Sequence, residues 1–275
     1  IRFRRDAGVV EIQKLDPDGD QMRAIQGREI AMIFQEPMTA FSPVHTIGSQ
    51  IDEMIALHVP RPAGVGRREA KRWVRARTIA MLHKVGMPSP DEIAEAYPHN
   101  LSGGMRQRAM IAMALSCNPR ILVADEPTTA LDVTLQAQVL GLMREMIRDF
   151  HTSVVFITHD LGVVAEIADR VVVMYLGRVV ESAPVDDLFY APKHPYTQAL
   201  IRSVPRTSGP IEKLVPIEGT VPSPLDMPEG CTFHTRCPFV MKGLCDARVP
   251  ELREVAGRHS VACFLHQPEV LDGRS

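Results

Sequence analysis

The sequence lacks an excess of charge of either sign. Its 275 residues carry 31 Lys and Arg against 33 Asp and Glu, which gives a formal net charge of −2. The net charge therefore gives the chain no overall attraction to nucleic acid or anionic lipid. Binding to such a partner would require a local basic patch. Basic residues concentrate between Arg61 and Lys84, where eight stand against Glu69 alone. This predicts the solvated face of a helix, with a basic surface near a membrane as the alternative.

Long apolar runs, a leader segment and a dense cysteine framework are also missing. No uncharged stretch approaches the ~18 residues that a membrane-spanning helix needs. The chain begins with Ile1, and its first residues contain no apolar segment followed by a small-residue cleavage site. We interpret this start as a truncation within a domain. Five scattered cysteines do not resemble the framework of a small secreted protein, and they favour a reducing cytosol.

The apolar residues predict a large α/β domain followed by an appendage. Short β-rich runs separated by helical patterns indicate a parallel sheet covered on both faces. Helical spacing over about 51–116 predicts an inserted helical subdomain. Prolines become frequent from Val185 onward, which predicts a core domain at 1–184 and a loop-rich extension at 185–275. The predicted strands lie at 29–34, 121–124, 153–158 and 171–175.

The strongest local signal is the segment ILVADEP at 121–127. An apolar strand ends there in two adjacent carboxylates, Asp125 and Glu126. Ligands of α/β proteins bind at the carboxyl edge of the parallel sheet, where Asp125 can hold Mg²⁺ beside a phosphate. Glu126 can polarise an attacking water. The alternative is a pair of acids that merely follow an ordinary strand.

Two further segments accompany these carboxylates. LSGGMRQR at 101–108 opens a predicted helix with Ser102, Gly103 and Gly104. Backbone N–H groups at a helix N-terminus favour an anion such as phosphate, although a plain serine N-cap is the alternative. A later predicted strand ends in His159, which brings an imidazole to the same edge of the sheet.

In this order and spacing, LSGGM, ILVADEP, TTALD and ITHD resemble the signature, Walker B, D-loop and switch-histidine motifs of ABC transporter ATP-binding subunits. IAMIFQEP is similar to the Q-loop of that family. Met105, PTTALDVT, the HPYT segment at 194–197 and the cysteine-bearing tail resemble the dipeptide/oligopeptide transporter subfamily. The resemblance covers the chain from about Val9 to its end and implies an α/β P-loop NTPase fold of the ABC type.

The resemblance also implies roles for individual residues. Asp125 is expected to bind Mg²⁺, and Glu126 to be the catalytic carboxylate. His159 is expected to contact the γ-phosphate of ATP. Gln35 is expected to sense that phosphate while bordering the surface that meets the permease. The residues further implied in nucleotide binding and at the dimer interface are Ser102, Gly103, Gly104 and Asp132.

One motif of that family is missing from the sequence. The family carries a G-x-x-x-x-G-K-[S/T] phosphate loop ahead of the Q-loop, and no such stretch exists here. Gly64 to Arg67 has neither the spacing nor a flanking strand. We attribute the missing loop to truncation. The chain is therefore expected to hold half of a nucleotide site and not to hydrolyse ATP by itself.

The last group of candidate functional residues is a set of four cysteines near the C-terminus. Four thiolates brought together can fill four metal-ligand positions, but the spacing here matches neither common zinc modules nor a bacterial ferredoxin. The resemblance suggests a [4Fe–4S] cluster; zinc and four unrelated buried thiols are the alternatives. The cysteines are Cys231, Cys237, Cys245 and Cys263. Histidines that could replace a thiolate around zinc are His234, His259 and His266.

Taken with the resemblance, these motifs predict the ATPase subunit of an importer for peptides or similar small solutes. A second identical or homologous ATPase subunit, two membrane permease subunits and, indirectly, an extracytoplasmic solute-binding protein are the expected partners. The expected location is the cytoplasmic face of the inner membrane, with no nucleic acid partner. Two alternatives stay open: a soluble ABC ATPase that acts on nucleic acid or ribosomes, and a non-catalytic metal or redox module on a degenerate core.

Overall fold

The computed structural model describes residues 1–5, 8–36, 40–129, 131–203 and 216–267. The chain forms two compact units, residues 1–159 and residues 160–275. Among the described residues, no helix has both the length and the apolar character that crossing a membrane requires. The sequence-based boundary after residue 184 stays a prediction.

A three-stranded parallel sheet is the centre of the first unit. Its order is β3-β4-β5, with Ile121 of β4 facing Ile30 of β3 and Ser153 of β5. The carboxyl ends of the three strands therefore meet at one edge, which confirms three of the predicted strands. The strands are β3 (Ile30–Ile33), β4 (Ile121–Asp125) and β5 (Ser153–Ile157).

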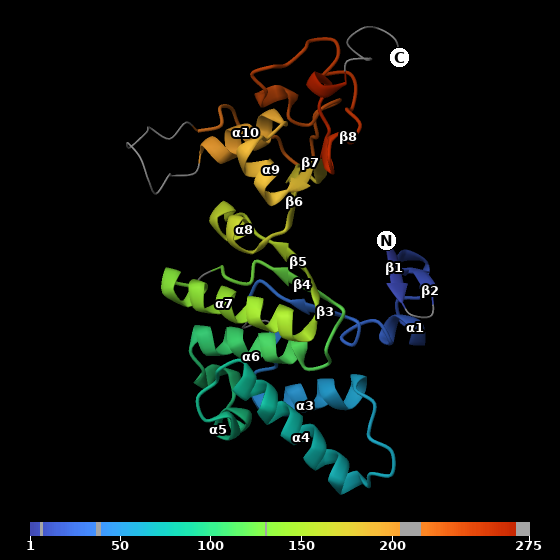
Figure 1. Ribbon diagram of the computed structural model, residues 1–275, viewed down its shortest axis with the longest axis vertical. Helices are drawn as coiled ribbons and strands as arrows, with labels where there is room; N and C mark the ends of the chain where they lie inside the picture. Colours follow the sequence, from blue (N-terminus) through green and yellow to red (C-terminus); the bar gives the residue numbers. More distant parts are fainter. Residues whose placement is uncertain (6–7, 37–39, 130, 204–215, 268–275) are drawn as a thin grey trace. The chain divides into compact units, whose positions relative to one another are not determined.

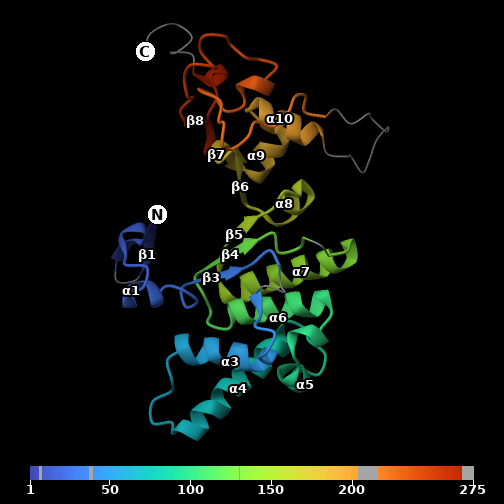
Figure 2. The same cartoon turned by 180° about the vertical axis from the view of Figure 1, so that it is seen from behind.

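Helices pack on one face of this sheet. Helix α6 contacts β3 and packs beside α7, and Figures 1 and 2 show α3, α4 and α5 further from the strands. Buried Ala31 and Ile33 of the sheet share one core with Met110 of α6 and Met143 of α7. Helices therefore follow β3 along the chain, and the bounds of the helical subdomain at about 51–116 stay a prediction. These helices are α3 (Ile47–His58), α4 (Arg67–Lys84), α5 (Pro90–Glu95), α6 (Gly103–Leu115) and α7 (Val133–Phe150).

The other face of the sheet differs from the prediction. Met32 alternates with buried residues of β3, and Val155 and Ile157 alternate with half-buried residues of β5. The exposed fractions of these three side chains are 39%, 52% and 46%. The expected cover on both faces is therefore incomplete within the part of the chain described. Smaller elements of this unit are β1 (Arg2–Arg5), β2 (Gly8–Glu11), α1 (Asp20–Arg23) and two 3₁₀ turns, Ile12–Lys14 and Pro98–Asn100.

The second unit contains an antiparallel sheet of order β6-β7-β9-β8. Leu176 and Gly177 connect β6 to β7 with φ values of 45° and 73°, as in the type I′ turns that favour two-residue hairpins. The prediction that the run at 171–175 joins the parallel sheet is therefore wrong, because this tight turn pairs it with the next strand. The strands are β6 (Arg170–Tyr175), β7 (Arg178–Pro184), β8 (Arg253–Ala256) and β9 (His259–Val261).

Turns and short helices make up most of the remaining second unit. A small core forms where the Phe233 ring packs edge-on against Tyr175, with centroids 5.3 Å apart, and against Tyr196 at 5.4 Å. The helices are α8 (Leu161–Ile167), α9 (Val185–Tyr190), α10 (Pro195–Arg202) and two 3₁₀ turns, His234–Arg236 and Phe264–His266.

Candidate active site and cysteine pocket

The backbone turns sharply after β4 and presents the Glu126 side chain at the carboxyl edge of the sheet. Glu126 has a φ of 44°, a left-handed conformation that is uncommon and strained for a residue other than glycine. Its N–H donates to the carbonyl of Ile157 at 2.9 Å, and its own carbonyl accepts the N–H of Thr129 at 3.1 Å. Two hydrogen bonds therefore hold the strained turn. Asp125, the last residue of β4, is half-buried at the same edge.

Three side chains converge on the Glu126 carboxylate. Gln35, just beyond β3, donates its Nε2–H to Oε2 at 2.8 Å. Thr129 donates its hydroxyl to the same oxygen at 2.9 Å. His159, beyond β5, places Nδ1 2.9 Å from Oε1. The contacts thus join Gln35, Glu126 and His159, which the sequence singled out, with Thr129, which it quoted only as part of the TTALD motif.

These contacts keep the Glu126 carboxylate ionised. The hydrogen bond with His159 is the largest cause that lowers its pKa, followed by the hydrogen bond from Thr129, while desolvation opposes them. An ionised carboxylate with one oxygen fixed by two donors is oriented to accept a proton at its other oxygen. The arrangement is therefore suited to activating a water molecule.

The signature segment forms the start of α6, as predicted. The Ser102 side chain caps the helix by accepting the N–H of Met105 at 3.3 Å. A Cβ added to Gly104 would lie 3.3 Å from Cδ2 of Leu135, so this glycine allows α6 to approach α7 closely. Gly103 begins the helix and is exposed.

Asp132 caps α7 by accepting the N–H of Leu135 at 2.9 Å. Within the described residues, no hydrogen bond or ion pair joins Asp132 or the signature segment to Glu126. The two groups of predicted site residues therefore occupy separate places in this chain, and the roles of the signature residues and Asp132 stay predictions.

Arg108 braces the signature helix from its second turn. Its Nη1 donates to the carbonyl of Val85 at 2.8 Å, and its Nη2 donates to Oε1 of Gln138 at 3.3 Å. These bonds tie α6 to the end of α4 and to α7.

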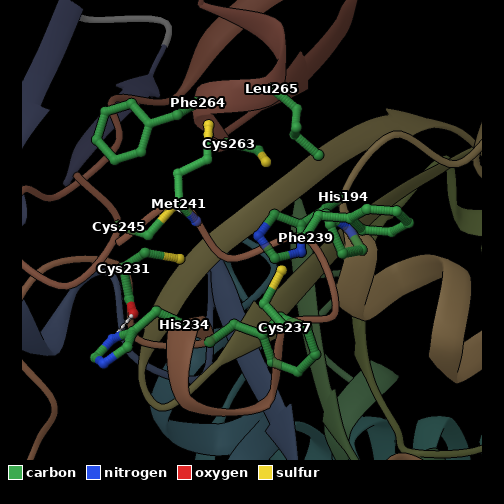
Figure 3. Close-up of a pocket in the computed structure, with 12 residues that line it drawn as sticks. His194, Cys231, His234, Cys237, Phe239, Met241, Cys245, Cys263, Phe264 and Leu265 are labelled. Atoms are coloured by element: carbon green, nitrogen blue, oxygen red, sulfur yellow. Dashed lines mark hydrogen bonds between the residues drawn. The ribbon is translucent and has the colours of Figure 1, made fainter. Parts of the chain in front are cut away.

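The four C-terminal cysteines line one small pocket, which Figure 3 shows together with His194 and His234. Burial raises the pKa values of Cys231 and Cys237, and raises that of Cys263 to about 12. Backbone N–H groups oppose this effect by donating to the sulfur atoms. Cys245 accepts the N–H of Met241 at 3.4 Å. The donors to the other three sulfur atoms are Phe233 and His234 for Cys231, Phe239 for Cys237, and Leu265 for Cys263.

A single metal ion does not fit this arrangement. In the described part of the chain, no group of three or more His, Cys, Asp or Glu side chains is placed to hold one ion. Two of the histidines considered for a zinc site are engaged elsewhere: His259 Nε2 lies 2.6 Å from Oε1 of Glu181, and His266 Nε2 lies 3.2 Å from the carbonyl of Lys193.

A buried carboxylate that the sequence did not reveal lies behind this pocket. Glu181 on β7 is fully buried. It accepts the backbone N–H groups of Lys193 at 2.6 Å and His194 at 2.9 Å, besides its contact with His259. His194 is 1% exposed, and burial lowers its pKa to about 4.

Solved structures of ATP-binding cassettes resemble this chain. The dimeric post-hydrolysis structure of the ATP-binding cassette MJ0796 bound to ADP and Pi matches with a TM-score of 0.54 and 25% identity, covering 67% of this chain and 73% of that one. The cassette cbiO1 from Clostridium perfringens matches in fold, with a TM-score of 0.51 and 24% identity over 62% and 61% of the two chains. Fold and site together define an ATPase of the ABC class.

Sequence comparison specifies the family within this class. The ABC transporter model matches residues 2–129, and the model of the oligopeptide/dipeptide transporter C-terminal region matches residues 180–245. The oligopeptide transport ATP-binding protein AppD of Bacillus subtilis is 52% identical over 89% of this chain and 72% of its own length. The dipeptide transport ATP-binding protein DppD of Escherichia coli is 44% identical over 95% and 79%. The chain belongs to the ABC transporter ATP-binding proteins, in the oligopeptide/dipeptide subfamily.

Proposed function

We propose that the full-length subunit, of which this chain supplies the residues from the Q-loop onward, hydrolyses ATP to drive the uptake of dipeptides, oligopeptides or related small solutes through a separate permease. The observation that carries the ATPase assignment is the convergence of Gln35, Thr129 and His159 on the Glu126 carboxylate. The solute class rests on the names of the relatives, which describe oligopeptide and dipeptide transport ATP-binding proteins. Those names give no support to an ATPase that acts on nucleic acid or ribosomes.

In the proposed reaction Glu126 is the general base for the attacking water. Thr129 and Gln35 hold Oε2, so Oε1 accepts the proton of the water once His159 turns from Oε1 to the γ-phosphate. Losing the hydrogen bond of His159 also raises the pKa of Glu126, which makes it a stronger base when the water attacks. Asp125 supplies an oxygen ligand to Mg²⁺, which neutralises charge on the phosphates.

A second ATPase subunit completes this proposal. The N–H groups at the start of α6, from Ser102 to Gly104, suit the phosphate of a nucleotide held by the opposite subunit. Asp132 at the start of α7 is assigned to the interface of that dimer. The dimeric state of the structural relative MJ0796 supports this assignment. The composition of the transporter determines whether the second subunit is identical to this one or a homologue of it.

The substitution Glu126→Gln tests the base. The assay uses a fusion that places a cassette phosphate-loop segment ahead of Ile1, since the 275 residues contain no such loop. The amide keeps the shape of the side chain but takes no proton, so we expect unchanged ATP binding and hydrolysis slowed by about 10²–10⁴. Glu145→Gln, which removes an exposed carboxylate on α7, is the matched control and should keep the parent rate. If Glu126→Gln hydrolysed ATP as fast as the unsubstituted fusion protein, another residue would have to be the general base.

We place the permease contact at a groove between α3 and α4, which sets the chain at the cytoplasmic face of the membrane. The groove has a volume of about 700 Å³ and is lined by Asp52, Trp73 and basic residues of α4. Lys71 and Arg72 are exposed there and form no ion pair within the described residues, so they are available to an acidic segment. The double change Lys71→Glu and Arg72→Glu should weaken permease binding in a pull-down while ATP binding stays intact. Unchanged permease binding would move the contact elsewhere.

We also propose that the four C-terminal cysteines hold a [4Fe–4S] cluster. The supporting observation is that four thiols from separate turns line one pocket, and each sulfur atom accepts a backbone N–H. Such hydrogen bonds favour the thiolate form, which is the form that ligates iron. When bound, the cluster cross-links turns that have little regular structure of their own.

Anaerobic purification of the chain tests this cluster. We expect brown protein with iron and acid-labile sulfide in near-equal amounts. Each Cys→Ser change in the pocket should remove most of the iron. Cys117→Ser is the matched control, because Cys117 lies in the first unit, where its thiol contacts the carbonyl of Met54 at 3.5 Å, and it should leave the iron in place. Zinc without sulfide, or no metal at all, would refute the cluster.

A further inference from the structure

The HPYT segment places a histidine at the cysteine pocket in one defined tautomer. His194 caps α10, and its Nδ1 accepts the backbone N–H of Tyr196 at 3.0 Å. A nitrogen that accepts a hydrogen bond carries no proton, so the proton of the neutral ring is on Nε2. The helix cap thus determines which nitrogen of His194 is the donor.

The Nε2–H group of His194 has no acceptor within the described protein. His194 is 1% exposed and lines the pocket together with all four cysteines (Figure 3). None of the hydrogen bonds formed by the described residues uses its Nε2. A donor that has no protein acceptor is unfavourable in so closed a site. An occupant of this pocket that offers an acceptor is therefore favoured.

Hydrogen bonds from the backbone fix the position of this donor. Glu181 accepts the N–H of His194 itself at 2.9 Å and that of Lys193 at 2.6 Å. The His194 ring also packs against Phe233, with a centroid distance of 5.8 Å. The imidazole is therefore held at the pocket from its backbone, its Nδ1 and its ring face.

We propose that His194 donates its Nε2–H to a sulfur atom of the cluster and thereby raises the reduction potential of that cluster. The inference rests on the proposed [4Fe–4S] cluster. Reduction adds negative charge to the sulfur atoms, so a neutral donor stabilises the reduced state more than the oxidised state. His194 is a positioning and tuning residue in this account and ligates no iron.

Two substitutions separate the donor from the helix cap. In His194→Asn, Oδ1 takes the place of Nδ1 and can still cap α10, but the side chain is too short to reach the pocket. In His194→Gln, the longer amide brings an N–H back towards the position of Nε2. Anaerobic redox titration of the chain, followed by the electron paramagnetic resonance of the reduced cluster, measures the potential of each variant with its full iron and sulfide.

We expect His194→Asn to lower the equilibrium constant of reduction about tenfold, which is about 59 mV for a one-electron couple. His194→Gln should recover most of this loss. Electron–nuclear double resonance of the unaltered protein should show an exchangeable proton coupled to the reduced cluster, a readout that needs no variant to fold. If the cluster is complete but the variants have unchanged potentials and no coupled proton is seen, the inference about His194 is overturned while the cluster proposal stands. Unaltered protein without iron and sulfide would refute the cluster proposal, and the inference with it.

Discussion

Removing the Glu181 carboxylate should loosen the segment that leads into α10. The side chain is fully buried and accepts three donors: the N–H of Lys193 at 2.6 Å, the N–H of His194 at 2.9 Å and Nε2 of His259 at 2.6 Å. These donors come from the loop before α10 and from β9, while Glu181 itself lies on β7. One side chain thus connects three parts of the second unit.

The size of the effect follows from these contacts. Glu181→Ala leaves three buried donors without an acceptor, and each such donor costs about 1–3 kcal/mol. The three share one carboxylate, so their costs do not simply add. Removing one partner of a buried charged contact typically costs about 3–5 kcal/mol, and we take this value for the whole site. Since about 1.4 kcal/mol corresponds to a factor of ten, local opening should become about 10²–10³ times more frequent.

Hydrogen exchange of the backbone amides measures this opening directly. The amides of Lys193 and His194 should exchange faster in Glu181→Ala by about that factor, while amides of β4 in the first unit serve as an internal control. Glu181→Gln keeps one acceptor oxygen, so its exchange rates at these amides should lie between those of the unaltered protein and those of Glu181→Ala. Unchanged exchange at both amides of Glu181→Ala would refute the reasoning that this carboxylate holds the loop.

Three smaller predictions concern the rest of the molecule. Arg108→Met should destabilise the first unit by about 1–2 kcal/mol in urea unfolding, because the carbonyl acceptor between α4 and α6 loses a charged donor. Thr129→Val should raise the pKa of Glu126 by removing a donor, so the acidic limb of ATP hydrolysis by the phosphate-loop fusion should move to higher pH. Burial lowers the pKa of His194 in the folded chain to about 4, from an ordinary value of 6.5; the unfolded chain therefore binds more protons between these values. The second unit should lose on the order of 3 kcal/mol of stability as pH falls through that window, as followed by thermal melts.

The meeting of Gln35, Glu126 and His159 at one edge of the sheet was predictable because each of these residues follows the end of a strand. Once ILVADEP is assigned to a buried parallel strand, Glu126 must lie at the carboxyl edge. His159 and Gln35 follow neighbouring strands to the same edge. Thr129 escaped this reasoning because its contact depends on the left-handed turn at Glu126. A backbone conformation of that kind leaves no pattern in the hydrophobic residues.

The fourth strand was assigned to the wrong sheet for a related reason. The run at 171–175 has the same apolar composition as a parallel core strand, and composition alone does not report the pairing partner. The pairing is decided by the turn that follows, where Leu176 adopts a positive φ. Leucine is not a typical residue for that conformation, which is most often occupied by glycine, asparagine or aspartate. The sequence signal for a hairpin was therefore weak, although Gly177 is a typical residue for the second position of the turn.

The network around Glu181 shows what sequence patterns leave out of a polar core. Its partners are 13 and 78 residues away along the chain, and a glutamate in a strand is ordinarily expected to face solvent. The HPYT segment was noticed only as a mark of resemblance, yet its histidine is held by this carboxylate and by the amide two residues later. A tautomer requires knowledge of which atom accepts which proton, and that knowledge comes from contacts between distant segments. The motif could therefore be detected in the sequence, whereas the donor that it presents to the cysteine pocket could only be derived from the fold.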